Sequence, residues 1–221
     1  MPVVSALLGL VVVTVVITAA MVIGRVLLRT MFKATSPFPD PVLSDVAAAA
    51  LGTMILSGVL FASVALHLVY RGVLWGLVAA CAIAAIPVLA RWAAGIPALF
   101  KRRDGGILWT AGAGFYFLIA AVLTALPPTL NDELIYHLAI PRAWLGTHGG
   151  FFFRDNIYAY FPQSGEMAFT LGLGTAGEAA ARLFHTASGF LLFLAVLRFA
   201  RSFLDRKHAR LAATALLSIP T

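Results

Sequence analysis

Cysteine is nearly absent from this chain, since Cys81 is the only one among 221 residues. A single thiol excludes an intrachain disulfide, and its position inside an apolar run predicts a small buried side chain. Charge is also scarce, because only 11% of the residues are charged, roughly half the share found in soluble domains. The composition therefore excludes an ordinary soluble domain and gives no information on the redox compartment.

The excess of basic residues does not indicate nucleic-acid binding. The formal net charge is +7, but most lysines and arginines lie at the ends of apolar runs, as they do in membrane proteins. The sequence also has no internal repeat, no low-complexity segment and no period-2 alternation typical of barrel strands. Helices are then the remaining way to satisfy the backbone of so apolar a chain in lipid.

Long apolar segments make up most of the sequence, which is 61% hydrophobic. About 20 apolar residues are enough to cross the hydrocarbon core of a membrane as a helix. The fold class is therefore predicted to be all-α, a multi-pass transmembrane helical bundle with an external loop that contains short amphipathic interfacial helices. The five predicted spans are Val3–Ile23, Val46–Val69, Gly72–Phe100 (interrupted by Pro87 and Arg91), Gly106–Leu126 and Glu178–Phe203, and Leu211–Thr221 begins a sixth.

Local signals mark the ends and the contacts of these spans. No Lys or Arg precedes Val3–Ile23, so this span does not have the form of a secretory signal. Ser44 or Asp45 is expected to cap the second span. Two glycine pairs predict positions at which neighbouring helices approach closely. These are Gly72 with Gly76, and Gly112 with Gly114.

The distribution of basic residues predicts the orientation of the chain. Cytoplasmic loops of membrane proteins carry an excess of Lys and Arg. With these spans, twelve of the 16 basic residues lie on one side, and the other side receives only Arg71, Arg142, Arg154 and Arg182. The N-terminus and the loop at about 127–177 are therefore predicted to be external, at the periplasmic face of the cell (inner) membrane.

Polar residues are concentrated in this loop, within Asn131–Phe169. Its first part, Thr129–Leu145, has the apolar spacing of a helix that lies along the membrane surface, with Trp144 at the interface. Pro141 predicts a kink or two short helices there. The ionisable side chains of the loop are Asp132, Glu133, His137, Arg142, His148, Arg154, Asp155 and Glu166.

Asp132 and Glu133 have two interpretations from spacing alone. Both follow Asn131 in a first helical turn, where acidic side chains cap the helix and suit its dipole. Either can instead be a water-facing carboxylate that carries chemistry. Glu133 and His137 are spaced i, i+4, as metal ligands can be, but no third or fourth ligand has convincing spacing, so a surface pair is preferred.

Three further polar residues have structural interpretations. Glu166 is expected to be a solvated or capping residue near the start of the last full span. His148 is expected to be a loop residue beside two glycines. His185 lies in a span and is expected to hydrogen-bond to a neighbouring helix, although intramembrane polar residues are often functional.

The sequence of the loop resembles the first external loop of the GT-C membrane glycosyltransferases. The resemblance is carried by Leu130–Leu138 (LNDELIYHL), by Arg142 and by the aromatic stretch Tyr158–Pro162 (YAYFP). Ala181–Gly189 and Arg210–Thr221 resemble the following helices of that family. The similarity is to the ArnT-like and protein-mannosyltransferase-like enzymes, whose donors are polyprenyl-phosphate sugars, and it covers about residues 109–221.

This resemblance implies roles for the charged residues of the loop. Asp132 is the implied catalytic base, and Glu133 supports it or is the alternative carboxylate. Arg142, Arg154 and Arg182 are the implied partners of the donor phosphate, which needs cationic stabilisation as it leaves. Simpler interpretations are that Arg142 and Arg182 snorkel at the interface and that Arg154 pairs with the adjacent aspartate.

The aromatic residues of the loop are candidates for stacking on a sugar or on an isoprenoid chain. Tyr136 and Tyr158 are assigned to substrate binding, with Tyr160 and Phe161 nearby. An aromatic belt at the membrane interface explains these residues equally well.

The resemblance also implies a division of the chain. Residues 1–105 are an N-terminal transmembrane extension of three spans, and residues 106–221 are the GT-C-like region with the catalytic loop. The second external loop of the family, with its further acidic residue, is not reached, so the chain is expected to be the first part of a longer enzyme. The implied partners are a polyprenyl-phosphate sugar donor, a glycan, lipid or protein acceptor, and membrane lipid. No cofactor is certain, and a divalent metal is left open.

Two other classes of protein are consistent with the composition. A secondary transporter or channel places charges at the middle of its spans, whereas the ionisable residues here collect at the ends. A non-catalytic membrane scaffold would use the loop to dock a partner, and its carboxylates would be dispensable. Neither the sugar nor the acceptor can be inferred from these residues.

Overall fold

The computed structural model describes residues 2–32, 38–99, 107–129, 131–150, 156–160 and 163–218. Every regular element in these ranges is helical, which confirms the predicted all-α class. Four of the helices are long and apolar enough to cross a membrane: α1 (Pro2–Met31), α2 (Pro41–Ala65), α3 (Arg71–Leu99) and α7 (Glu178–Ala200).

The helix α4 (Ile107–Leu123) is shorter than the predicted fourth span. Its 17 residues correspond to about 26 Å at 1.5 Å per residue, somewhat less than the roughly 30 Å of the hydrocarbon core. The helix ends three residues before Leu126 because the backbone there turns back, with Ala125 N donating to Val122 O and Leu126 N to Leu123 O. The last helix, α8 (Arg206–Leu217), begins five residues before the predicted start of a sixth span and is capped by Asp205.

The helix α2 begins earlier than predicted, and its cap is Asp40 rather than Ser44 or Asp45. The Asp40 carboxylate accepts from Leu43 N at 2.9 Å, and a proline at the first helical position suits this start. Asp45 instead pairs with Arg25 of α1 at 2.6 Å. The predicted interruption of the third span is also wrong, because Pro87 lies within the continuous helix α3.

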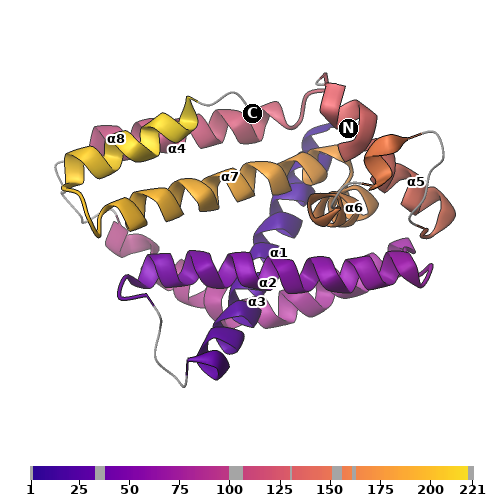
Figure 1. The fold of residues 1–221 in the computed structure, drawn as a ribbon, viewed down its shortest axis with the longest axis horizontal. Coiled ribbons are helices and arrows are strands. Elements are labelled where there is room, and N and C mark those ends of the chain that lie inside the picture. The colour runs from indigo at the N-terminus through magenta and orange to yellow at the C-terminus, as the bar shows by residue number, and fades with distance from the viewer. Residues whose placement is uncertain are drawn as a thin grey trace.

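The long helices run side by side along the molecule, except α1, which crosses them obliquely (Figure 1). One end of the molecule, here called the loop end, contains Ser5, the turn at 66–70 and Glu178. There Ser5 Oγ donates to Ala176 O, and Val69 N donates to His148 O at 3.0 Å. The opposite end, here called the basic end, contains the Arg25–Asp45 pair and an ion pair between Arg198 and Asp40 at 2.6 Å.

The crossing of α1 over α2 is the closest contact in the described residues. A Cβ atom at Gly52 would lie 1.8 Å from Ala20 O, and one at Gly24 would lie 1.9 Å from Ala48 O. Glycine is therefore required at both positions for the backbones to approach. The glycine pairs predicted from the sequence are not such positions, because a Cβ at Gly72, Gly76, Gly112 or Gly114 meets nothing within 4 Å.

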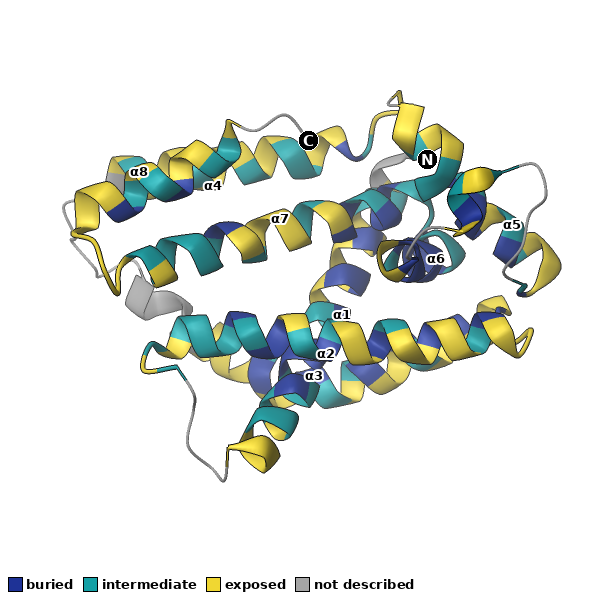
Figure 2. Cartoon of the chain, viewed as in Figure 1, coloured by how far each residue is buried: buried dark blue, intermediate teal, exposed yellow. Residues whose placement is uncertain are grey.

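Exposed residues recur along the outer surface of the long helices (Figure 2), and many of them are large and apolar. Leu108, Met54 and Ile83 are 86%, 71% and 72% exposed. So many exposed apolar residues would be unfavourable in water and are expected on helices that face lipid. These surfaces support a membrane protein, consistent with the length of the four helices.

Four short helices connect α4 to α7 at the loop end. They are the π-helix η1 (Glu133–His137), α5 (Ala139–Thr147), the 3-10 helix η2 (Ile157–Tyr160) and α6 (Ser164–Ala176). In Figure 1, α6 is seen end-on and lies across the direction of the long helices. It packs against α1, α2 and α7, so α6 is a buried part of the bundle.

Candidate functional site

The segment predicted as one amphipathic helix is divided at Leu138. Leu138 N donates to Glu133 O at 2.9 Å, which is the i to i+5 bond of a π-helix, and α5 begins at the next residue. Pro141 lies in the first turn of α5, where a missing N–H is tolerated. The two short helices were predicted, but Trp144 is fully buried, so the prediction that it lies at the membrane interface is wrong.

Asp132 lies at the N-terminal end of η1. Its backbone is helical, with φ −64° and ψ −38°, and its side chain makes no capping hydrogen bond. Among the described residues its carboxylate has no hydrogen-bond or ion-pair partner. Of the two interpretations left open by the sequence, capping is therefore not supported for Asp132.

Glu133 is held by Arg182, which lies one turn into α7. Arg182 Nε donates to Glu133 Oε1 at 2.9 Å, and the two side chains are 14% and 16% exposed. Arg182 Nη1 also donates to the carbonyls of Leu123, Thr124 and Leu126, at 3.3, 3.1 and 2.6 Å. Arg182 thus satisfies the carbonyls at the end of α4, which no helical N–H can reach.

Glu166 contradicts the sequence prediction of a solvated or capping residue. It lies in the first turn of α6 and is 4% exposed. His137 Nδ1 lies 2.8 Å from Glu166 Oε1, which links η1 to α6. The sequence contained one signal for this burial, namely that Glu166 is the only charged residue in the stretch 163–177.

A polar cavity of about 720 Å³ lies where these elements meet. Its walls come from α4, η1, α6 and α7, and they bring together ionisable side chains that are far apart in the sequence. Asp132, Glu133, His137, Arg182 and His185 line it, together with Tyr116, Thr124, Asn131, Phe169 and Thr186. Glu133 Oε2 is buried and has no hydrogen-bond partner in the described part of the chain, so an acceptor is left at this wall.

Arg142, another predicted phosphate partner, does not lie at this cavity. Arg142 is on α5, where it forms an ion pair with Glu178 of α7; both side chains are more than 40% exposed. Arg154 lies outside the described residues, as do the neighbouring Asp155 and Phe161. Of the three predicted arginines, the structure therefore places only Arg182 beside Asp132 and Glu133.

Tyr136 and Tyr158 form a stacked pair beside the cavity. Their ring centroids are 5.0 Å apart with an interplanar angle of 13°. Burial raises the pKa of the Tyr136 phenol above its ordinary 10.0, and the negative charges of Asp132 and Glu166 raise it further. Neither tyrosine is part of the cavity wall. Their stacking joins η1 to η2.

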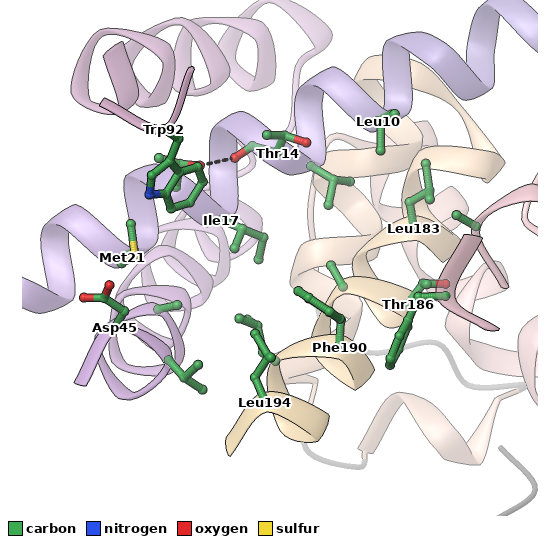
Figure 3. Close-up of a pocket in the computed structure, with 18 of the residues that line it drawn as sticks. Leu10, Thr14, Ile17, Met21, Asp45, Trp92, Leu183, Thr186, Phe190 and Leu194 are labelled. Atoms are coloured by element: carbon green, nitrogen blue, oxygen red, sulfur yellow. Dashed lines mark hydrogen bonds between the residues drawn. The ribbon is translucent and has the colours of Figure 1, made fainter. Parts of the chain in front are cut away.

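A second, apolar cavity of about 440 Å³ lies between α1, α2 and α7 (Figure 3). Leu10, Ile17, Leu183, Phe190 and Leu194 point into it in Figure 3, and Asp45 and Trp92 lie at its far side. Thr186 of α7 lines both this cavity and the polar one. This adjacency could not be predicted from the sequence, because it depends on α1 and α7, at opposite ends of the chain, lying together.

The remaining predictions concern His148, His185 and a metal site. His148 ends α5 in a left-handed conformation, as expected of a loop residue beside glycines, and stacks on Tyr70 at 4.0 Å. His185 lines the polar cavity and makes no hydrogen bond to a neighbouring helix in the described residues, contrary to the prediction. Within those residues no three His, Cys, Asp or Glu side chains gather as a metal site.

The chain was compared with known proteins once this geometry was established. No family model, no curated protein and no solved structure matches it. The function must therefore be inferred from the residues of the site.

Proposed function

We propose that this protein is a membrane glycosyltransferase of the GT-C type. It would transfer a sugar from a polyprenyl-phosphate donor to an acceptor at the external face of the cell membrane, with the loop end outside. The observation that carries the proposal is the position of Asp132. This carboxylate has no partner among the described residues and lines a polar cavity at the end of helices able to cross a membrane.

The proposed reaction requires one proton acceptor and one stabilised leaving group. The acceptor hydroxyl oxygen attacks the anomeric carbon while the bond from that carbon to the phosphate oxygen breaks. Asp132 takes the hydroxyl proton, and the electrons of the broken bond remain on the polyprenyl phosphate. Glu133 is a less suitable base, because its Oε1 already accepts a hydrogen bond from Arg182.

The two adjacent cavities suit a donor with a polar head and a long apolar chain. The polar cavity has room for a sugar phosphate, and the apolar cavity is lined almost entirely by hydrocarbon. A lipid-linked donor needs both environments within one molecular length. This arrangement supports the donor class and does not distinguish one sugar from another.

The test is transfer of a labelled sugar from a synthetic polyprenyl-phosphate donor in proteoliposomes. Asp132→Asn is expected to lower kcat about 100-fold or more, as loss of a general base does. Glu178→Gln is the matched control, because Glu178 is exposed at the same end of the molecule and does not line the cavity. Undiminished transfer by Asp132→Asn would remove the basis of the proposal.

A secondary transporter is the second candidate, and one observation favours it. Ion pairs between helices, such as Glu133 with Arg182 and His137 with Glu166, are frequent on proton and substrate pathways in membranes. The same proteoliposomes separate the two functions. Flux of a solute without any covalent product would identify a transporter.

A further inference from the structure

The polar cavity contains few groups that can bind an anion. Arg182 is its only arginine in the described residues, and Nε and Nη1 of this side chain already donate to Glu133 and to three backbone carbonyls. Arg142 pairs with Glu178 outside the cavity wall. Of the Arg182 guanidinium, Nη2 is left for a ligand, and a second N–H donor at this wall would share the charge of the donor phosphate.

His137 can supply this donor because of the carboxylate behind it. Glu166 is 4% exposed, and His137 is its only charged partner among the described residues. An ionised carboxylate without a cation is very unfavourable in such a buried position. Nδ1–H of His137 directed to Glu166 Oε1 is the partner that the structure provides, and a ring that carries a proton on both nitrogens has Nε2–H available to a ligand.

The ring of His137 is also fixed in place. Its centroid lies 3.9 Å from that of Tyr136 and 5.4 Å from that of Phe169, with which it stacks. His137 and Phe169 line the cavity, whereas Glu166 does not. A ring held by one hydrogen bond and two aromatic neighbours loses little freedom when a ligand binds, which favours affinity.

We propose that His137 binds the phosphate of the lipid donor through Nε2–H, and that Glu166 is the positioning residue that orients its ring. The ligand class is a phosphate ester of an isoprenoid alcohol. This inference rests on the proposed function and adds a division of roles to it. Asp132 receives the acceptor proton, and the His137–Glu166 pair stabilises the charge that develops on the leaving phosphate.

The experiment measures binding and needs no turnover. Farnesyl methyl phosphate, farnesol and inorganic phosphate are titrated into the full chain in nanodiscs. His137→Gln is expected to weaken binding of farnesyl methyl phosphate about tenfold or more, the loss that follows when a charged hydrogen bond is removed. Binding of farnesol should not change. Binding of inorganic phosphate with the same sensitivity to His137→Gln would assign the site to free phosphate and overturn the lipid part of the proposal.

Three further variants keep the inference testable. Glu166→Gln should weaken binding in the same direction, and it covers the case in which His137→Gln fails to fold. His208→Gln is the matched control, since His208 forms the same kind of pair with Asp205 on the exposed surface. His185→Gln should weaken binding of the phosphodiester less than His137→Gln does, because His185 has no carboxylate partner among the described residues.

The outcomes separate this inference from the proposed function. If His137→Gln and Glu166→Gln bind the phosphodiester as the unchanged protein does, the role of His137 is wrong, even if Asp132 proves essential for transfer. If binding depends on His137 but no sugar is transferred, the phosphate site stands and the proposed reaction fails.

Discussion

Arg182 of α7 donates from Nε to Glu133 Oε1 of η1 at 2.9 Å. Its Nη1 donates to carbonyls at the end of α4, so Arg182 connects three helices. The side chains of Arg182 and Glu133 are 14% and 16% exposed. Arg182→Gln leaves Glu133 without its cation in this largely buried place. We expect a loss of about 3 kcal/mol in the free energy of unfolding, visible as a lower melting temperature in detergent.

Glu133→Gln provides the complementary measurement. The double variant with Arg182→Gln should be destabilised by less than the sum of the single variants, because each single change removes the same ion pair. If the loss of stability in the double variant equals the sum of the two single losses, the interaction between Glu133 and Arg182 contributes nothing to stability. The carbonyl contacts of Arg182 would then be its main structural role.

The crossing of α1 over α2 gives a second prediction. A methyl group at Gly52 would lie 1.8 Å from the backbone oxygen of Ala20, and a backbone atom cannot move aside as a side chain can. Gly52→Ala should therefore destabilise the protein by about 1–3 kcal/mol or more. Gly76→Ala is the matched control, since nothing lies within 4 Å of the added atom. Equal melting temperatures for the two variants would contradict the close crossing.

The long helices could be predicted from the sequence because apolar length is a local property. The ends of α2 and α7 lie within a few residues of the predicted spans, and only the cap of α2 was misassigned. Which glycines lie at helix crossings depends on which faces meet. Gly24 and Gly52 could not be distinguished from Gly76 by sequence spacing.

The candidate site was predicted in part. Asp132, Glu133 and Arg182 were singled out from the sequence, and the structure brings them to one cavity. Glu166 was misjudged because a charged residue after a proline-containing loop is usually solvated. Its burial depends on α6 lying across the bundle, which no local periodicity indicated.

Acid should weaken the ion pair between Arg198 and Asp40 at the basic end. The hydrogen bonds from Nε and Nη2 of Arg198 lower the pKa of Asp40 below its ordinary value of 3.8. A depressed carboxyl pKa stabilises the folded state above the unfolded value, and this contribution is lost as the pH falls through the folded pKa. Asp40→Asn should therefore melt at a lower temperature than the unchanged protein at neutral pH, and the difference should disappear only as the pH falls well below 3.8.

Asparagine isolates the charge in this experiment, because it still caps a helix. Glu178→Gln is the control for a surface pair, and its effect should be small at any pH, since exposed pairs contribute about 0–1 kcal/mol. A difference for Asp40→Asn that persists unchanged in acid would mean that the ion pair is not its cause.

Thr186 tests whether the two cavities act together, as the proposed lipid donor requires. It lines both of them, so a phenylalanine at this position would occupy space where the polar and the apolar cavity adjoin. In the unchanged protein, affinity for isoprenoid phosphates should increase from dimethylallyl to geranylgeranyl phosphate as more of the chain is buried, by up to about 0.8 kcal/mol per buried methylene group. Thr186→Phe should reduce this increase and leave the affinity for dimethylallyl phosphate nearly unchanged. Ser188→Phe, on an exposed part of α7 outside both cavities, should keep the dependence on chain length. If Thr186→Phe also keeps it, the chain of the lipid does not pass this residue, and the apolar cavity has no part in binding the donor.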